Sequence, residues 1–383
     1  MKRFLLFTML SIHFLLLFLP VSAFAQETAD GFLYQVGNDG NVTITGYSGT
    51  NTKVDIPSAI DSHPVTAIGN GAFTNSDIIT IVTIPEGVIN IGKGAFSDCR
   101  FLEDVTLPST LQAIGEGAFK SAVSLKSIVI PEGISIIESE TFSNCPEMHK
   151  AILPKSLKTI EDASFCNSGL ITIDLPQGLE RIGFSAFLCS NSLESLNIPS
   201  SIKDVKNSQF DSCQSLKSVI LSAGLSDFCY EFSYCPNLEK VAIPKSVKSI
   251  DSKYMFDGSY KVNIWGFSGS SAEKLAKKLN LPFVAVDPVK SVILHCRGEN
   301  VNSGKLEIDL NSDEKTLQLT AQTSPDSPWP GVTWKSSNAK VASIDNNGLV
   351  TGLKKGKVTI TATAIDGSGT KSVCEVIVCN TAK

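Results

Sequence analysis

The chain has 383 residues, of which 42% are hydrophobic and 19% charged, and its formal net charge at pH 7 is −5. A mildly acidic chain lacks the basic surface that nucleic acid requires, so we expect no nucleic acid partner. The length exceeds what one ordinary hydrophobic core supports, so at least two folded domains are expected.

Residues 1–25 have the pattern of a secretory signal peptide. Lys2 and Arg3 form a basic start, an apolar stretch follows, and Ala23-Phe24-Ala25 is a small-residue cleavage site. The apolar stretch is shorter than the ~20 residues that span a bilayer. We expect cleavage, export to the extracellular space, cell surface or periplasm, and no membrane insertion afterwards.

Residues 26–67 have a composition typical of β structure. The segment GFLYQVGNDGNVTITGYSGTNTKVDIP contains strand-forming runs that are separated by Asn, Asp and Gly turns. We predict an antiparallel β cap that covers the first unit of the repeats that follow.

Phenylalanine recurs every 22 to 24 residues through residues 68–265. The recurring residues are Phe73, Phe96, Phe119, Phe142, Phe165, Phe187, Phe210, Phe232 and Phe256. Self-similarity at this period indicates a solenoid, here of about nine repeats of ~23 residues, in which each unit buries its apolar face against its neighbours. The phenylalanines are expected to form a continuous internal column.

Each repeat carries a second apolar pattern, LxxLxLP, as in Leu102, Val105, Leu107 and Pro108. The alternation at its end predicts a short strand. Proline ends that strand because it offers no amide hydrogen to the next rung. Strands stacked at ~4.8 Å would form a parallel sheet along the solenoid.

The fuller string LxxLxLPxxLxxIGxxAFxxC, as in LEDVTLPSTLQAIGEGAF, resembles the BspA-like leucine-rich repeats of bacterial surface proteins. The resemblance covers roughly residues 56–265. It implies adhesion to host or extracellular-matrix proteins or to other bacteria. The segment AEKLAKKLN then predicts a short helix within a C-terminal cap, residues 266–286, with Leu275 and Leu279 on one face and Asn280 as its stop.

Residues 287–383 lose the 23-residue period and show short strands between Ser, Asn, Asp and Gly turns, which is typical of a β-sandwich. The predicted strands are 291–294, 316–321, 332–335, 340–344, 348–351, 357–364 and 373–378. Trp334 is expected to be the central core aromatic. The segment VTWKSSNAKVASIDNNGLVTGLKKGKVTITATA resembles the bacterial Ig-like domain, group 2, although residues 295–310 are longer than usual there. This resemblance implies no chemistry, so the whole chain is expected to be mainly β.

The sequence offers little to catalysis. The chain after residue 25 has three histidines, His63, His149 and His295, and no two fall at metal-ligand spacing. Each IGxGAF string is a structural turn rather than a phosphate loop. We therefore expect a protein that is not an enzyme, with no cofactor and no metal.

The ten cysteines divide into seven in the repeats and three beyond residue 290. Four of them follow the column phenylalanine by three residues, namely Cys99, Cys145, Cys213 and Cys235. One interpretation is a core column of small buried thiols. The other is disulfide bonding, between Cys213 and Cys235 on adjacent rungs and between Cys296 and either Cys374 or Cys379.

Residues between the apolar strand positions must face outwards. Val129, Ile152 and Ile171 fall on consecutive rungs with His149 and Lys150 beside them, which predicts an exposed apolar spot with a polar rim. We hypothesise that it binds a protein partner, either a host extracellular protein or a bacterial surface protein. The alternative is that these residues only reflect strand propensity on an exposed sheet.

Two other functions stay open at this point. A glycan-binding accessory protein would use aromatic side chains as stacking platforms, and the candidates are Tyr260, Trp265, Trp329 and Trp334. A structural envelope or spacer protein would have no specific ligand.

Overall fold

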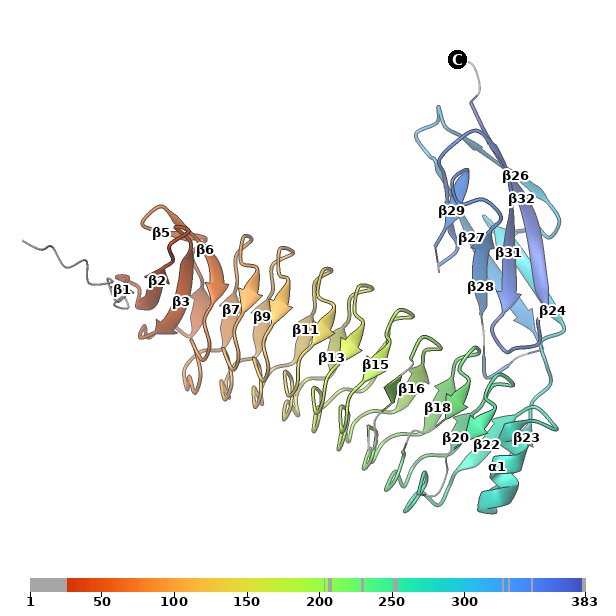
Figure 1. Cartoon of the computed structure of the whole chain (residues 1–383), viewed down its shortest axis with the longest axis horizontal. Helices are drawn as coiled ribbons and strands as arrows, with labels where there is room; N and C mark the ends of the chain where they lie inside the picture. The colour runs from red at the N-terminus through yellow and green to blue at the C-terminus, as the bar shows by residue number, and fades with distance from the viewer. Residues whose placement is uncertain are drawn as a thin grey trace, which may run out of the picture.

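The computed structural model describes residues 26–202, 204–205, 209–228, 231–250, 254–325, 327–329, 331–345 and 347–380. The predicted signal peptide lies outside these ranges. The described part of the chain forms an elongated solenoid with a smaller β domain at its C-terminal end (Figure 1). Within the ranges described, no helix has the length and hydrophobicity needed to cross a membrane.

The predicted strand is present on one side of the solenoid in most repeats, and the repeat at residues 171–174 contributes only isolated bridges at Thr172. These strands are β4 Lys53–Asp55, β7 Ile81–Thr83, β9 Asp104–Thr106, β11 Ser127–Val129, β13 Lys150–Ile152, β16 Ser195–Ile198, β18 Ser218–Leu221, β20 Lys240–Ala242, β22 Asn263–Gly266 and β23 Phe283–Ala285. The strands pair in parallel within three groups, β4-β7-β9, β11-β13 and β16-β18-β20-β22-β23. In the first group Val54, Val82 and Val105 stand side by side. These middle residues are buried and the residues around them face outwards. We call the outer side of this series the strand face.

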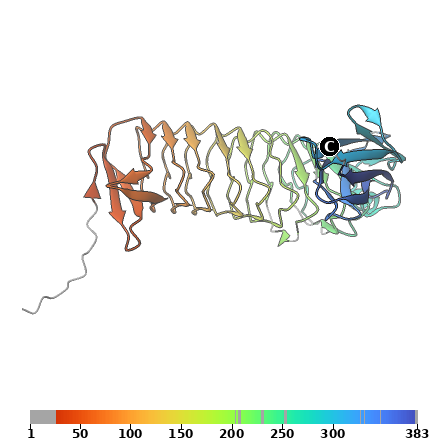
Figure 2. The ribbon, with the colours of Figure 1, turned by 90° about the horizontal axis from the view of Figure 1, so that it is seen from above.

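A second series of two-residue strands lies across the core. It consists of β8 Asn90–Ile91, β10 Ala113–Ile114, β12 Ile136–Ile137, β14 Thr159–Ile160, β15 Arg181–Ile182, β17 Asp204–Val205, β19 Asp227–Phe228 and β21 Ser249–Ile250. Parallel pairing links successive members, as between β12, β14 and β15. Figure 2, seen from above, shows the rungs following one another along the solenoid axis.

The phenylalanine column is present as predicted. Successive rings from Phe73 to Phe256 are stacked, with centroid separations from 4.9 to 6.4 Å. The rings from Phe96 to Phe232 are fully buried. The column lies between the two strand series, so each rung depends on its neighbours for burial of its largest side chain.

The position three residues after most of the column phenylalanines supplies a buried hydrogen bond between rungs, although Phe119 is followed there by Ala122, which has no side-chain donor. The Sγ of Cys145 donates to the carbonyl oxygen of Phe119, and the Oγ of Ser190 donates to that of Phe165. Cys99, Cys213, Cys235 and Ser259 repeat this contact. Thiol and hydroxyl are interchangeable here because both are small donors, as the core-column interpretation requires.

The disulfide alternative is not realised in the structure. Cys213, Cys235, Cys296 and Cys379 are all free thiols. Of the two partners considered for Cys296, Cys374 faces the core, whereas Cys379 faces away from it at the end of the same strand. Burial, and to a smaller degree the nearby Cys296 thiol, raises the pKa of Cys374 to about 11.

Both ends of the solenoid are covered. At the N-terminal end, β1 Gln26–Glu27, β2 Phe32–Val36 and β3 Val42–Tyr47 pair antiparallel, and β3 then pairs in parallel with β6 His63–Ile68, on which β5 Ala59–Ile60 folds back. At the other end, helix α1 Ser271–Leu279 buries Ala272, Leu275 and Ala276. Asn280 ends this helix in the left-handed conformation, as predicted.

The C-terminal domain is an Ig-like sandwich of two sheets. Its strands are β24 Ser291–Cys296, β25 Glu299–Asn300, β26 Lys305–Asp309, β27 Thr316–Ser324, β28 Val332–Ser336, β29 Ala342–Ile344, β30 Leu349–Gly352, β31 Gly356–Ala364 and β32 Lys371–Cys379. One sheet has the order β25-β24-β27-β30-β29 and the other β26-β32-β31-β28. Sequence analysis missed β25 and β26, which lie in residues 295–310. Strand β26 pairs in parallel with β32.

The expectation for the central tryptophan of this domain is corrected. Trp334 is only half-buried at the edge of the sandwich core. The fully buried tryptophan is Trp329, and it packs outside the sandwich against the solenoid. Its ring stacks on Phe267 with a centroid separation of 5.5 Å, and its Nε1–H donates to the carbonyl oxygen of Leu221 at 2.7 Å. Trp329 therefore anchors the Ig-like domain on the solenoid.

Candidate binding face

The strand face is organised in columns of outward side chains that run along the solenoid axis. One column contains the last outward residue of each strand, including Thr83 and Thr106 on the N-terminal rungs. It continues through Val129 and Ile152, which pair with each other in β11 and β13. On the C-terminal rungs it contains Asn197, Ile220, Ala242 and Trp265. The character of the column thus changes from polar to apolar twice.

Val129 and Ile152 form the exposed apolar part of this column. Their side chains are 58% and 45% exposed, and the parallel pairing places them side by side. Two branched aliphatic side chains at the spacing of adjacent strands offer a continuous apolar contact to a partner. The sequence analysis placed these two residues together, and the structure does the same.

Ile171 does not extend this pair. The backbone ladder runs from the amide of Ile171 to the carbonyl oxygen of His149, and from the amide of Glu194 to that of Ile171. Ile171 is therefore in the column of His149, whereas the bridge between Lys150 and Thr172 puts Asp174 beside Ile152. Ile171 is 42% exposed but lies away from Ile152 along the strand direction. The predicted single apolar spot is thus two separate features.

His149 and Lys150 are exposed at the end of β13 opposite to Ile152. Ion pairs flank them on both sides, Glu103 with Lys126 and Glu194 with Lys217. The hydrogen bond that Lys126 donates to the Glu103 carboxylate raises the pKa of Lys126, as expected for a cation that gains a carboxylate. Within the described ranges, neither His149 nor Lys150 has an ion-pair partner. Among the described residues, Lys150 is therefore a cation without an ion pair on the strand that carries Ile152.

The C-terminal part of the same column is covered by the Ig-like domain. Ile220 and Trp265 are half-buried and Ala242 is fully buried, all around Trp329. Lys240 lies over the Trp265 ring, 4.7 Å from its centroid, and burial lowers the pKa of this lysine. The sequence analysis missed this docking surface. The sequence does contain a signal for this surface, because Ile220, Ala242 and Trp265 are apolar residues at outward positions on successive rungs next to the domain boundary.

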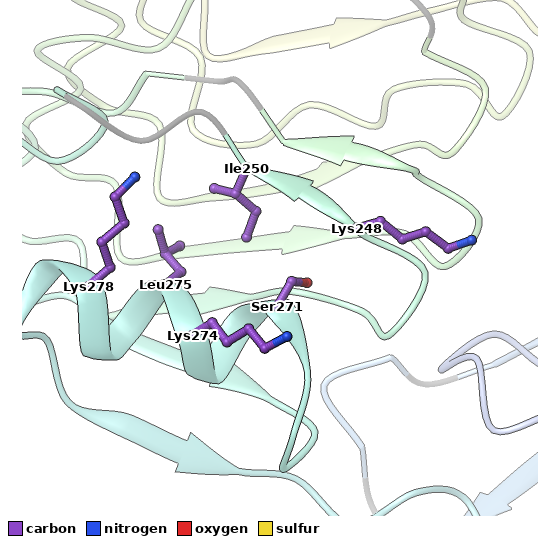
Figure 3. A pocket seen from close by; sticks show the side chains of 6 residues that line it. All are labelled: Lys248, Ile250, Ser271, Lys274, Leu275 and Lys278. Atoms are coloured by element: carbon purple, nitrogen blue, oxygen red, sulfur yellow. The ribbon is translucent and has the colours of Figure 1, made fainter.

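A pocket lies at the C-terminal cap, between α1 and β21 (Figure 3). Its apolar floor is formed by Ile250 and Leu275, and its remaining lining residues are Lys248, Ser271, Lys274 and Lys278. In Figure 3 the Lys278 side chain points away from those of Lys248 and Lys274, and the three nitrogen atoms lie apart. Because their ammonium groups do not converge, we interpret this feature as a solvated rim of the cap rather than as an anion site.

The binding face presents few kinds of chemical group. Its exposed groups are aliphatic side chains, one imidazole and paired or single surface charges. Within the described residues, no group of three or more His, Cys, Asp or Glu side chains could hold a metal ion. The arrangement suits non-covalent recognition by contact and charge.

Comparison with known proteins agrees with this architecture. The family model of the BspA type leucine rich repeat region matches in six copies over residues 47–168 and 135–263. The model of the bacterial Ig-like domain, group 2, matches residues 312–374. Together the repeat matches span more than half of the chain.

Similar proteins were found among curated sequences and solved structures. A lacto-N-biosidase of Bifidobacterium bifidum is 29% identical over 157 residues, which are 36% of this chain and 14% of that protein. The chain spans only 6% to 14% of the length of four curated relatives that it matches.

Two crystal structures illustrate the structural matches. A leucine rich cell surface protein of Faecalibacterium prausnitzii is 21% identical, with a TM-score of 0.41 and coverage of 70% of this chain and 96% of that one. The pneumococcal vaccine antigen PcpA is 16% identical, also with a TM-score of 0.41, and the coverage is 70% and 99%. With the repeat match over residues 47–263, the chain belongs to the BspA type leucine rich repeat family, and it carries a bacterial Ig-like domain at its C-terminal end.

Proposed function

We propose that this protein is an exported, surface-exposed binding protein that recognises a protein partner through the strand face at Val129 and Ile152. The observation that supports this most is that the apolar pair lies in the same outward column as Ile220 and Ala242, which are covered by another domain. A solenoid has no need of outward aliphatic side chains for its own stability. The family fits a surface or binding role.

The charges beside the pair define the partner further. Lys150 is an unpaired cation among the described residues at one end of β13, and the apolar pair lies at the other side of the same strands. A complementary protein surface would present an apolar side chain next to a carboxylate. Attraction between these charges would act mainly on the association rate and would weaken as salt is added.

The name of the glycosidase relative does not transfer to this chain. The chain corresponds to 14% of the length of that enzyme. We propose a non-catalytic role for the chain. Host extracellular-matrix proteins and bacterial surface proteins are the partner classes to test first.

The experiment measures binding of immobilised residues 26–383 to purified extracellular-matrix proteins by biolayer interferometry. The double variant Val129→Asp/Ile152→Asp should raise the dissociation constant by about 30-fold or more, because loss of a central contact typically costs ~2 kcal/mol or more. The matched control is Thr83→Asp/Thr106→Asp, which introduces the same charges at the same column positions on other rungs.

The control variant should bind like the wild type. Equal weakening by both double variants would mean that charge anywhere on the strand face matters, and the proposed site would then be wrong. Binding that survives Val129→Asp/Ile152→Asp would place the contact on another face of the solenoid.

A further inference from the structure

A crevice separates the Ig-like domain from the solenoid beside the Trp329 anchor. Its volume is about 310 Å³. On the solenoid side it is lined by the residues that follow the strand on three successive rungs, Gln177, Ser200 and Ser222. On the other side it is lined by β28, including Trp334, and by Asn347 of the neighbouring turn. Pockets at domain interfaces of this kind are common places for small ligands.

The chemistry of the lining excludes charged ligands. None of the residues that line the crevice is ionisable. A charged group that entered would lose hydration without gaining a counter-charge, which is costly. By contrast, amides and hydroxyls both donate and accept hydrogen bonds, which matches a neutral ligand rich in hydroxyl groups.

The polar groups of the solenoid wall are available to such a ligand. Gln177 and Ser200 are exposed, and Ser222 is half-exposed. Among the described residues, none of their side chains takes part in a hydrogen bond. Gln177 and Ser200 are at equivalent positions on adjacent rungs, ~4.8 Å apart, and Ser222 lies on the next rung one position earlier, in register with Pro199.

Trp334 supplies an aromatic wall that is held in place. Its ring packs on the backbone of Gly348, where an added Cβ would lie 3.2 Å from the ring. Gly348 also has a φ of +83°, so the close approach depends on glycine. The ring is half-buried and lines the crevice. A crevice lined by an indole ring on one wall and by hydroxyls and an amide on the other is suited to a sugar ring, which has a C–H face and a hydroxyl edge.

The crevice is formed before any ligand binds. The Trp329 indole donates to Leu221, the residue directly before Ser222, so the anchor fixes the two walls relative to each other. Pre-formed walls reduce the entropy that a ligand must lose on binding. The volume is at the lower end of small-molecule sites, which favours one or two sugar rings over a folded protein segment.

We propose that this interdomain crevice binds a neutral saccharide, with Trp334 as the stacking platform and Gln177, Ser200 and Ser222 as hydrogen-bonding partners. This site is separate from the apolar pair on the strand face. It is therefore independent of the proposed protein partner.

The test uses residues 26–383 and four neutral probes, namely lactose, maltotriose, cellotriose and N,N′-diacetylchitobiose. Binding is followed by isothermal titration calorimetry and by the indole ¹H–¹⁵N resonance of Trp334, assigned through its loss in Trp334→Phe. At least one probe should bind at up to millimolar concentration and shift that resonance. Trp334→Ala should weaken binding of that probe at least tenfold.

A second variant guards against loss of folding in Trp334→Ala. Gln177→Ala/Ser200→Ala changes only exposed side chains of the opposite wall and should weaken binding about fivefold or more without lowering the melting temperature. The matched control Gln112→Ala removes an exposed amide on a rung outside the crevice and should bind like the wild type. Val129→Asp/Ile152→Asp should also keep saccharide binding, which separates this site from the proposed protein site.

Three results would overturn the proposal. They are no binding of any of the four probes, binding that is unchanged in both crevice variants, and binding that leaves the Trp334 resonance unshifted. If an extended peptide shifts the Trp334 resonance and none of the four saccharides does, the edge strand β28 would instead be identified as a peptide site.

Discussion

The strand face carries apolar outward residues in two stretches of one column, and the two stretches differ in what covers them. Ile220, Ala242 and Trp265 pack against the Ig-like domain. Val129 and Ile152 remain about half exposed. Both stretches have the same strand geometry and the same buried interior, so the difference does not arise from the repeat itself. It arises from whether a second surface is present.

The residues between the two stretches make the comparison sharper. Asp174 and Asn197 occupy the same column where neither the Ig-like domain nor the apolar pair lies. Polar residues thus fill the column where it meets water, and apolar residues fill it where a domain is docked. Val129 and Ile152 are apolar like the stretch that the Ig-like domain covers, but none of the residues that the structure describes covers them. This supports the proposed binding role.

The largest expected effect comes from removing the anchor of the covered stretch. Trp329→Ala deletes a fully buried indole and its hydrogen bond to Leu221, so the contact between domains should lose about 3 to 5 kcal/mol. The Ig-like domain should then separate from the strand face. Small-angle X-ray scattering should show a larger radius of gyration, and proteolysis between residues 286 and 290 should become faster.

The control for this variant is Tyr260→Ala, which removes a ring that is 89% exposed. It should change stability by no more than about 0.5 kcal/mol and leave the scattering profile as it is. An unchanged profile for Trp329→Ala would show that contacts other than this indole hold the domains together.

An intermediate effect is expected when the same substitution is made in both stretches. Ile220→Asp places a carboxylate against the docked domain and should cost about 1 to 3 kcal/mol, because the charge loses hydration. Ile152→Asp places it in water and should cost no more than about 0.5 kcal/mol. Denaturant unfolding of the two variants measures both values. Equal costs would mean that the covered and exposed stretches do not differ in the way described.

The smallest effect concerns the interior that both stretches share. Burial raises the pKa of Cys99 and of Cys145 to about 12, from an ordinary value of 9.0. A raised pKa in the folded state means that this contribution to stability is complete below pH 9 and is lost as the pH rises towards 12. The wild type should therefore lose stability between pH 9 and 11 more steeply than the variant Cys99→Ser/Cys145→Ser.

The serine variant is a fair comparison because serine already occupies the same position at Ser190 and Ser259. It should cost less than about 1.5 kcal/mol at neutral pH, since the hydrogen bond to the phenylalanine carbonyl is retained. Parallel pH profiles for the two proteins would indicate that the thiols are not buried as described.

The repeat architecture could be predicted because its signals are local and repeated. The column phenylalanine, the strand alternation and the helix stop at Asn280 each depend on residues within one unit of the chain. An alignment error of one position in a single repeat is corrected by comparison with the other repeats. The paired positions of Val129 and Ile152 followed from the same alignment.

The remaining features depend on contacts between distant segments. The docking of Trp329 involves a loop without periodicity and a rung more than 100 residues earlier, so no local pattern favoured Trp329 over Trp334. Ile171 was grouped with Ile152 because they lie on consecutive rungs, although its alignment with His149 put it in another column. Strand β26 was missed because its parallel partner is β32, at the far end of the domain.

The position of the docked domain also determines how long the open part of the strand face is. The open part of the strand face is bounded by the N-terminal cap at one end and by the Ig-like domain at the other (Figure 1). Each rung adds ~4.8 Å to that open part and contacts only its neighbours. Duplication of one unit between β9 and β11 would therefore lengthen the span by one step while both ends stayed intact. Related proteins with more or fewer repeats could in this way keep the same cap and the same docked domain and still match partners of different size.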